Sequence, residues 1–195
     1  MSSIQGYTSS THFKNELLDF MGIISILVLG FASVVCMIIY PNFNILFNVF
    51  SDFGYWPKTA AIFNSALLVK GVLDFVFIIH IFDDLKIKDW KTRLFLFVPM
   101  VSTLMIGVFP KLPLRPIHWF FVIVTFVSFT LMQNVLARKT QDKEFLRFSN
   151  FFITLEYILM IFIFPSDIFW GIGEVLQLIL FVTWLWRFQR QLHRF

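Results

Sequence analysis

Six long apolar runs occupy most of this chain of 195 residues, and short connections rich in proline or charged residues separate them. A helix needs about 20 apolar residues to cross the hydrocarbon core of a bilayer. The expected spans cover residues 20–40, 59–82, 93–109, 117–137, 148–164 and 171–188. This pattern predicts an all-α fold, a polytopic membrane protein with six transmembrane helices in one bundle.

The composition excludes an ordinary soluble domain. Hydrophobic residues make up 58% of the chain and charged residues only 14%. Soluble domains carry about 25% charged residues. We therefore divide the chain into a mobile cytoplasmic head at residues 1–19, a membrane domain at 20–188 and a basic cytoplasmic tail at 189–195.

Lysine and arginine set the expected orientation of the helices. One side of the membrane has only Lys58, Lys111 and Arg115, while Lys70 lies within a span. The other side has twelve basic residues, namely Lys14, Lys86, Lys88, Lys91, Arg93, Arg138, Lys139, Lys143, Arg147, Arg187, Arg190 and Arg194. Basic residues collect in cytoplasmic connections. We expect an integral plasma-membrane protein with both termini in the cytoplasm.

Three ionisable side chains lie inside the predicted spans: Lys70, Asp74 and Glu156. Counting ~1.5 Å per helical residue places Lys70 and Glu156 near the midplane. An unpaired charge there costs about 2.5–3.5 kcal/mol. We expect Lys70 to pair with Asp74, one turn away, or with Glu156 on another helix. The group is either a structural ion pair that sets helix register or part of a proton or substrate path.

A second polar set lies in the loops and helix ends of the outer side. We expect Asp52, Asn64, His118 and Glu174 to converge there on one binding pocket, because polar groups at this depth need partners. His118 could act as a general base with Asp52 or Glu174 as its carboxylate partner, and Ser51 is then the candidate nucleophile. Alternatively, His118 belongs to an interfacial aromatic belt and Asp52 caps its loop.

No spacing typical of a metal or cofactor site is present. The four histidines, His12, His80, His118 and His193, are scattered over both sides of the membrane. We therefore expect no metal. Glycine-rich phosphate loops and nucleophile motifs are also missing, so we expect no cofactor. The net charge of +4 follows membrane topology and does not indicate a nucleic-acid partner.

Three segments resemble, in order, the motifs of one membrane family. They are SDFGYWPKTAAIFNSALLVKG at residues 51–71, GVFPKLPLRPIHWFF at 107–121 and GIGEVLQLILFVTWLW at 171–186. Together they are similar to the six-helix membrane family called domain of unknown function 998. The resemblance spans residues 51–184 and implies a six-helix fold with a marked outer face, without implying an activity.

The resemblance carries over eight positions of the family pattern: Ser51, Asp52, Gly54, Asn64, Gly71, Pro110, His118 and Glu174. The chain departs from the pattern at Phe53, Lys111 and Trp119. Lys111 replaces an acidic residue, which puts an acidic role of that loop in doubt. Lys70 and Asp74 lie outside the pattern.

Three functions are compatible with these residues. The first is a non-enzymatic binding or accessory protein whose outer pocket holds a lipid head group or a partner membrane helix. The second is a membrane enzyme that acts on outer-leaflet lipid through His118 with Asp52 or Glu174. The third is a small proton-coupled transporter that uses Lys70, Asp74 and Glu156.

The orientation makes a labelling prediction. A cysteine introduced in the connection at residues 110–116 should react from outside the cell with a membrane-impermeant maleimide, whereas one introduced at residues 83–92 should not. The lone Cys36 is replaced by alanine in both variants. The reverse labelling pattern would show that the helices cross the membrane in the opposite orientation.

Overall fold

The structure, a computed structural model, describes residues 17–110, 114–163 and 170–192, and these are helical apart from their connections. Each of six helices is long and apolar enough to cross a membrane. They are α2 (Met21–Ile39), α3 (Ala60–Asp84), α4 (Trp90–Val108), α5 (Arg115–Lys139), α6 (Lys143–Ile163) and α7 (Trp170–Leu192). The predicted fold class is confirmed. Residues 1–16 of the head, Lys111 and the last three residues of the tail lie outside the described residues.

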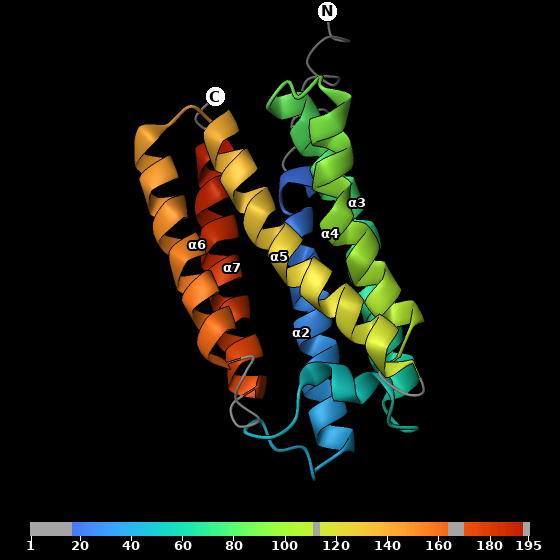
Figure 1. Ribbon diagram of the computed structural model, residues 1–195. Helices are drawn as coiled ribbons and strands as arrows, with labels where there is room; N and C mark the ends of the chain where they lie inside the picture. Colours follow the sequence, from blue (N-terminus) through green and yellow to red (C-terminus); the bar gives the residue numbers. More distant parts are fainter. Residues whose placement is uncertain (1–16, 111–113, 164–169, 193–195) are drawn as a thin grey trace, which may run out of the picture.

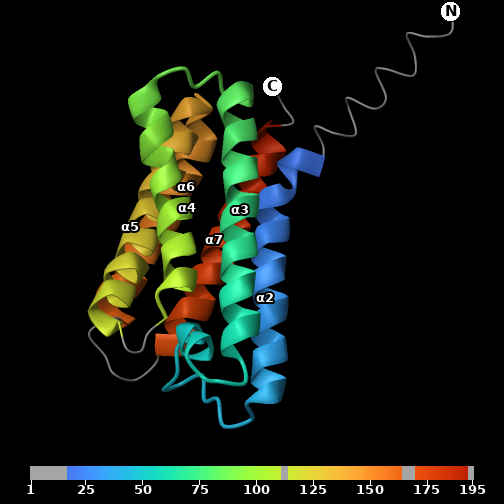
Figure 2. The ribbon, with the colours of Figure 1, turned by 90° about the vertical axis from the view of Figure 1, so that its right-hand side faces the viewer.

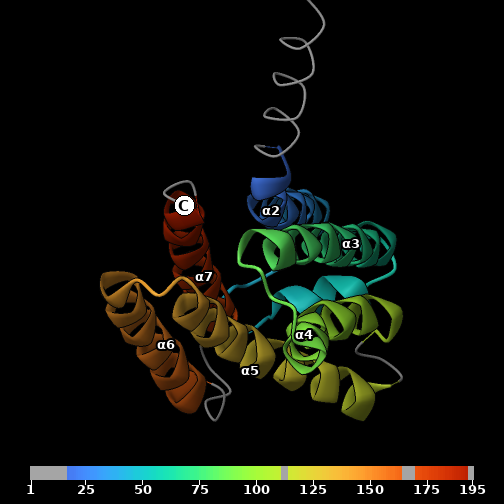
Figure 3. The same cartoon turned by 90° about the horizontal axis from the view of Figure 1, so that it is seen from above.

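The helices alternate in direction along the bundle, and each packs on the next in the chain (Figure 1). The start of α2 and the last turn of α7 lie at the same end of the bundle. The α3–α4 and α5–α6 connections lie at that end too. A short 3-10 helix, η1 (Phe50–Gly54), lies at the opposite end. Figure 2 shows α2 and α3 side by side, and Figure 3 shows α7 beside α2. The chain therefore closes around an interior.

Several helices begin or end a few residues beyond the predicted spans, because polar side chains cap them outside the hydrocarbon. Asp89 accepts hydrogen bonds from the Thr92 backbone N–H at 2.8 Å and hydroxyl at 2.7 Å, so α4 begins at Trp90. These hydrogen bonds hold the pKa of Asp89 below its ordinary value. Asp142 accepts from the backbone N–H groups of Glu144 and Phe145 at the start of α6.

The apolar core is divided into two clusters along α3. Phe63 and Leu67, from the first half of the helix, pack with residues such as Cys36 near η1. Phe77 and Ile81, from the second half, pack in the cluster at the other end, which also contains Leu96, Leu136, Trp184 and Phe188. Lys70 and Asp74 lie between the two clusters in the sequence of α3. The polar residues thus fall where the apolar packing is interrupted.

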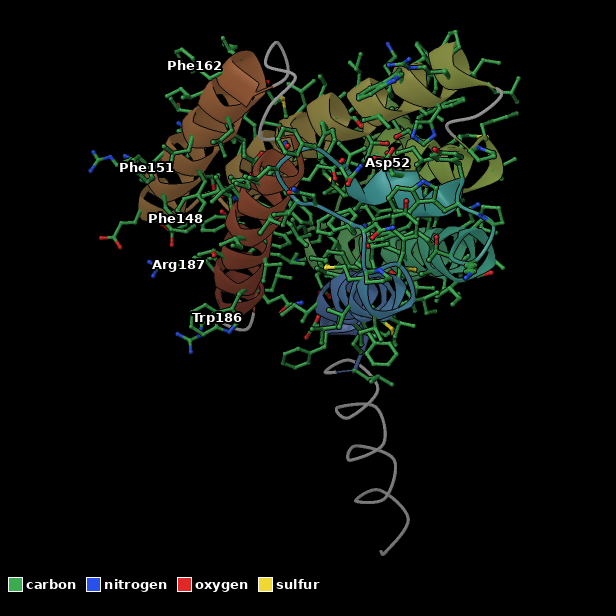
Figure 4. All side chains as sticks on the ribbon, turned by 90° about the horizontal axis from the view of Figure 1, so that it is seen from below. Asp52, Phe148, Phe151, Phe162, Trp186 and Arg187 are labelled. Carbon is green, nitrogen blue, oxygen red and sulfur yellow. The ribbon has the colours of Figure 1, made fainter. Side chains whose placement is uncertain are left out.

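The outside of the bundle carries exposed apolar side chains, as expected of a surface that faces lipid. Figure 4 shows Phe148, Phe151 and Phe162 along α6, with Trp186 and Arg187 on α7, away from Asp52. Phe151 is 60% exposed and Phe162 is 73% exposed. The Arg187 guanidinium lies 5.4 Å from the Phe148 ring centroid. Trp side chains and basic residues are both typical of the ends of membrane spans, as Trp186 and Arg187 illustrate.

Close packing of α3 against α4 depends on a glycine. A Cβ at Gly71 would come within 2.5 Å of Leu104 Cδ2, whereas a Cβ at Gly30 would meet nothing within 4 Å. We predict that Gly71→Val destabilises the bundle by about 1–3 kcal/mol through overpacking. Thermal unfolding in detergent measures this, with Gly30→Val as the control. Equal effects of the two substitutions would show that the contact does not matter.

Candidate functional site

A cavity of about 170 Å³ lies inside the bundle. All six helices and η1 contribute to its wall, which includes Leu29, Ser51, Thr103, Glu156 and several residues each of α3, α5 and α7. For comparison, an engineered cavity of ~150 Å³ in another protein holds one benzene molecule. Most of the wall is aliphatic or aromatic, and its polar members are Ser51, Lys70, Thr103, Thr125, Thr130, Gln133, Glu156, Glu174 and Gln177. The cavity is therefore of a size and character suited to a small amphiphilic molecule.

Lys70 lines the cavity, and its charge is paired with that of another residue of the protein. Its Nζ forms an ion pair with Asp74 Oδ2 within α3, and the Ser25 hydroxyl of α2 donates to Asp74 Oδ1. The Phe129 ring of α5 lies 4.9 Å from the ammonium. Both charged residues are buried. The pair therefore ties α3 to α2 and α5 and offsets the cost of placing two charges in the membrane.

Glu156 is held by α5 and not by Lys70. Its side chain is 1% exposed, and it accepts hydrogen bonds from Thr130 Oγ1 at 2.8 Å and from Gln133 Nε2 at 2.7 Å. Each carboxylate oxygen receives one of these donors. The two contacts join α6 to α5, beside the cavity.

Two buried polar atoms that belong to cavity-lining residues of α5 lack a hydrogen-bond partner among the described residues. They are Gln133 Oε1 and Thr125 Oγ1. Both residues line the cavity; Gln133 is 0% exposed and Thr125 is 9% exposed. A buried polar group without a partner costs about 1–3 kcal/mol. Both atoms are too deeply buried for a water molecule to touch them, so they lie in the packed interior behind the cavity surface.

The outer-face residues predicted from sequence are used to hold η1 in place. Asn64 Nδ2 of α3 donates to the Gly54 carbonyl at 2.9 Å, and Glu174 Oε2 of α7 accepts from the Phe50 N–H at 2.6 Å. Asp52 Oδ2 accepts from the Val49 N–H at 3.1 Å, within its own loop. Phe50 and Ser51 of η1 line the cavity. Asn64 and Glu174 therefore anchor, from two helices, the segment that forms this part of the cavity wall.

His118 occupies a different position. It is 2% exposed in the first turns of α5, and its Nδ1 lies 2.8 Å from the Phe109 carbonyl at the end of α4. Of the four residues predicted to converge, Glu174 lines the cavity, whereas Asp52, Asn64 and His118 do not. The structure thus brings Asn64 and Glu174 to the same short helix and uses His118 to join α4 to α5.

Two residues of the sequence motifs have a physical explanation in these contacts. A Cβ at Gly54 would come within 2.5 Å of Asn64 Oδ1, so only glycine leaves room for the Asn64 amide to reach the Gly54 carbonyl. Trp184 is completely buried, and its Nε1 donates to Ser149 Oγ at 2.8 Å, which joins α7 to α6. Both positions serve the packing of the bundle.

One cluster at the other end of the bundle could offer ligands to a metal ion. His80 Nε2 lies 2.9 Å from Asp19 Oδ1 and 3.3 Å from Asp84 Oδ2, and the three ligand atoms lie within 4.8 Å of one another. These distances are those of hydrogen bonds, so contacts between the side chains alone account for the cluster. Sequence reasoning did not single out this cluster, because Asp19 and His80 are 61 positions apart.

Sequence reasoning also missed Ser25, Thr130 and Gln133. Each is a polar residue within an apolar span, which is the only signal that the sequence offers. Their partners, Asp74 and Glu156, lie on other helices. Only the packing of the bundle reveals these pairs.

The comparison with known families agrees with this architecture. The family model described as protein of unknown function (DUF998) matches residues 23–188. The chain belongs to the DUF998 family. The match extends over η1 and nearly all of the region from α2 to α7, so it includes the first span, which the sequence motifs did not reach. Neither the curated proteins nor the solved structures include a match to this DUF998 chain.

The Lys70–Asp74 pair makes a stability prediction for this DUF998 protein. Lys70→Met should lower the free energy of unfolding by about 3–5 kcal/mol, because Asp74 then lacks its counter-charge inside the membrane. The double variant Lys70→Met/Asp74→Leu should recover much of the loss. Thermal unfolding in detergent measures both effects, and the exposed Lys58→Met is the control. A negligible effect of Lys70→Met would mean that the pair does not stabilise the bundle.

Proposed function

We propose that the protein is a non-enzymatic binding protein of the plasma membrane that holds a small amphiphilic molecule, such as part of a lipid, in its central cavity. The ligand enters from the outer end of the bundle, where η1 and Glu174 contribute to the cavity wall. This assignment of the outer end rests on the proposed cytoplasmic location of both termini.

The mixed character of the cavity wall is the observation that carries this proposal. Phe126, Phe129 and Phe181 provide an aromatic surface for an apolar group. The wall also includes the polar residues Lys70, Glu174 and Gln177. Binding sites for small molecules are typically apolar cavities with a few polar groups that orient the ligand.

The contacts favour binding over catalysis. A general base has to lie within hydrogen-bond reach of the group that it activates. His118 and Asp52 do not line the cavity. The Nδ1 atom of His118 faces the Phe109 carbonyl, and Asp52 accepts from its own loop. The enzyme hypothesis based on His118 therefore receives no support from the arrangement of these side chains.

One observation supports the proton-coupled transporter as a second candidate. Lys70 and Glu156, near the midplane, line the same cavity as Glu174 near η1. Transport also needs access from the opposite end, where Ile81, Leu136 and Phe188 are completely buried in the larger apolar cluster. Uptake of a ligand into proteoliposomes, rather than binding alone, would favour this candidate.

Binding can be tested by fluorine NMR on the full-length protein in detergent, with 4-fluorotoluene and 4-fluorophenol as probes. We expect at least one probe to give a protein-bound resonance. Val122→Trp should abolish the resonance, because Val122 lines the cavity, whereas Val127→Trp on the exposed face of the same helix should not. Leu178→Phe provides a second, milder block if Val122→Trp fails to fold. Wild-type protein without a bound resonance, or blocked variants that retain it, would contradict the proposal.

A further inference from the structure

We infer that the start of α6 and the end of α7 form a binding surface for the head group of an anionic phospholipid. The head group contacts Arg147 of α6 and Arg187 and Arg190 of α7, which are all exposed. This surface lies on the outside of the bundle at the end opposite η1. It is therefore distinct from the cavity and independent of the proposed cavity ligand, since none of the three arginines lines the cavity.

Charge at this end of the bundle is distributed unevenly around the helices. Among the described residues, the side formed by α2, α3 and α4 has four basic and four acidic residues: Lys86, Lys88, Lys91 and Arg93, with Asp19, Asp83, Asp84 and Asp89. The side formed by α5, α6 and α7 has two acidic residues, Asp142 and Glu144, and six exposed basic ones: Arg138, Lys139, Lys143, Arg147, Arg187 and Arg190. We call these six the basic surface. Basic residues collect in cytoplasmic connections, but both sides lie at the same end of the bundle, so this tendency does not explain the difference.

The positive charge of the basic surface is not offset by a described carboxylate. Between described residues, ion pairs join only Lys70 and His80 to carboxylates. The Asp142 carboxylate accepts hydrogen bonds from two backbone N–H groups at the start of α6 and from Gln191 Nε2. A phosphate group can supply the missing negative charge, because its oxygens accept paired hydrogen bonds from one guanidinium.

Aromatic rings hold the two arginines of α7 in place. Arg187 Cζ lies 5.4 Å from the ring centroid of Phe148 on α6, and Arg190 Cζ lies 3.8 Å from the ring centroid of Trp186. Figure 4 shows Phe148, Arg187 and Trp186 on the same side of the bundle. Side chains that are already ordered lose less conformational entropy when a ligand binds. The arginines are therefore arranged in advance for a phosphate group.

The depth of Arg147 and Arg187 suits the head group of a lipid. Arg147 lies four residues after the start of α6, and Arg187 lies five residues before the end of α7. These separations correspond to ~6 Å and ~7.5 Å along the helix axes. Both residues therefore lie at the ends of the apolar spans. In the proposed orientation this end meets the cytoplasmic leaflet, which carries anionic lipids, and clusters of basic residues at this level are typical of sites for their head groups.

The exposed face of α6 favours a phospholipid over a soluble phosphate. Phe151, Ile158 and Phe162 follow Arg147 by four, eleven and fifteen residues, so all four share one face of the helix. The three apolar side chains are 60%, 44% and 73% exposed. An acyl chain can lie along this apolar stripe while the phosphate of the same lipid contacts Arg147. A soluble anion gains nothing from the stripe.

The inference can be tested by native mass spectrometry of the full-length protein in detergent. The protein is titrated with an equimolar mixture of phosphatidylglycerol and phosphatidylcholine, whose acyl chains are the same except that those of the phosphatidylcholine are deuterated to separate the masses. We expect phosphatidylglycerol to bind at least about 5-fold more tightly, the factor that one basic residue near an anionic lipid provides. Glycerol 1-phosphate at the same concentration should not displace it, because this compound lacks acyl chains.

Matched variants assign the preference to the named residues. Arg147→Gln/Arg187→Gln should weaken binding of phosphatidylglycerol by about 25-fold and leave binding of phosphatidylcholine unchanged. The control Lys88→Gln/Lys91→Gln removes the same charge from exposed residues of the α3–α4 side, and it should change neither affinity. Because Arg187 also packs on Phe148, Arg147→Gln/Arg190→Gln replaces the first variant if that one does not fold.

Each outcome either supports or overturns the inference. A preference for phosphatidylglycerol that only the arginine variants lose supports it. Equal binding of the two lipids by the wild type would overturn it. An equal loss in the lysine control would also overturn it, because net charge and not this surface would then set the preference. Displacement by glycerol 1-phosphate would overturn it in favour of a soluble phosphate.

Discussion

The cost of placing charged and polar groups inside a membrane is the constraint on which this structure depends. Lys70, Asp74 and Glu156 all lie within spans, and each is buried against partners. Asp74 pairs with Lys70 within α3, and the other partners lie on neighbouring helices. Each of these ionisable side chains therefore also takes part in a contact between two helices. Because water is not available there, these contacts have few alternatives, which makes them specific determinants of how the helices pack.

The same constraint explains the architecture of the η1 end without an appeal to catalysis. A short segment outside the α-helices is tolerated near the membrane only when its backbone groups have partners. Asn64 provides a donor to the Gly54 carbonyl, and Glu174 provides an acceptor for the Phe50 N–H. Asn64 and Glu174, which look like site residues in the sequence, therefore hold η1, and η1 forms part of the cavity wall.

The cavity is the feature of the bundle that suggests a function. Most polar side chains in the described interior have partners, and in the cavity wall the carboxylates of Glu156 and Glu174 accept hydrogen bonds that join neighbouring elements. Aromatic rings and these polar groups together form the mixed wall on which the proposed binding of a small amphiphilic molecule rests. Membership of the DUF998 family agrees with the architecture and leaves the ligand to be established by experiment.

The sequence by itself determined the class, the number of spans and most of their limits, because the length and hydropathy of a span follow directly from the thickness of the bilayer. It also identified Lys70 and Asp74 as neighbours, since residues four apart share a helix face. The tertiary structure alone decided that Glu156 binds Thr130 and Gln133, and that six helices and η1 contribute residues to one cavity. Contacts between helices depend on how each helix is rotated and tilted, and packing against its neighbours sets both.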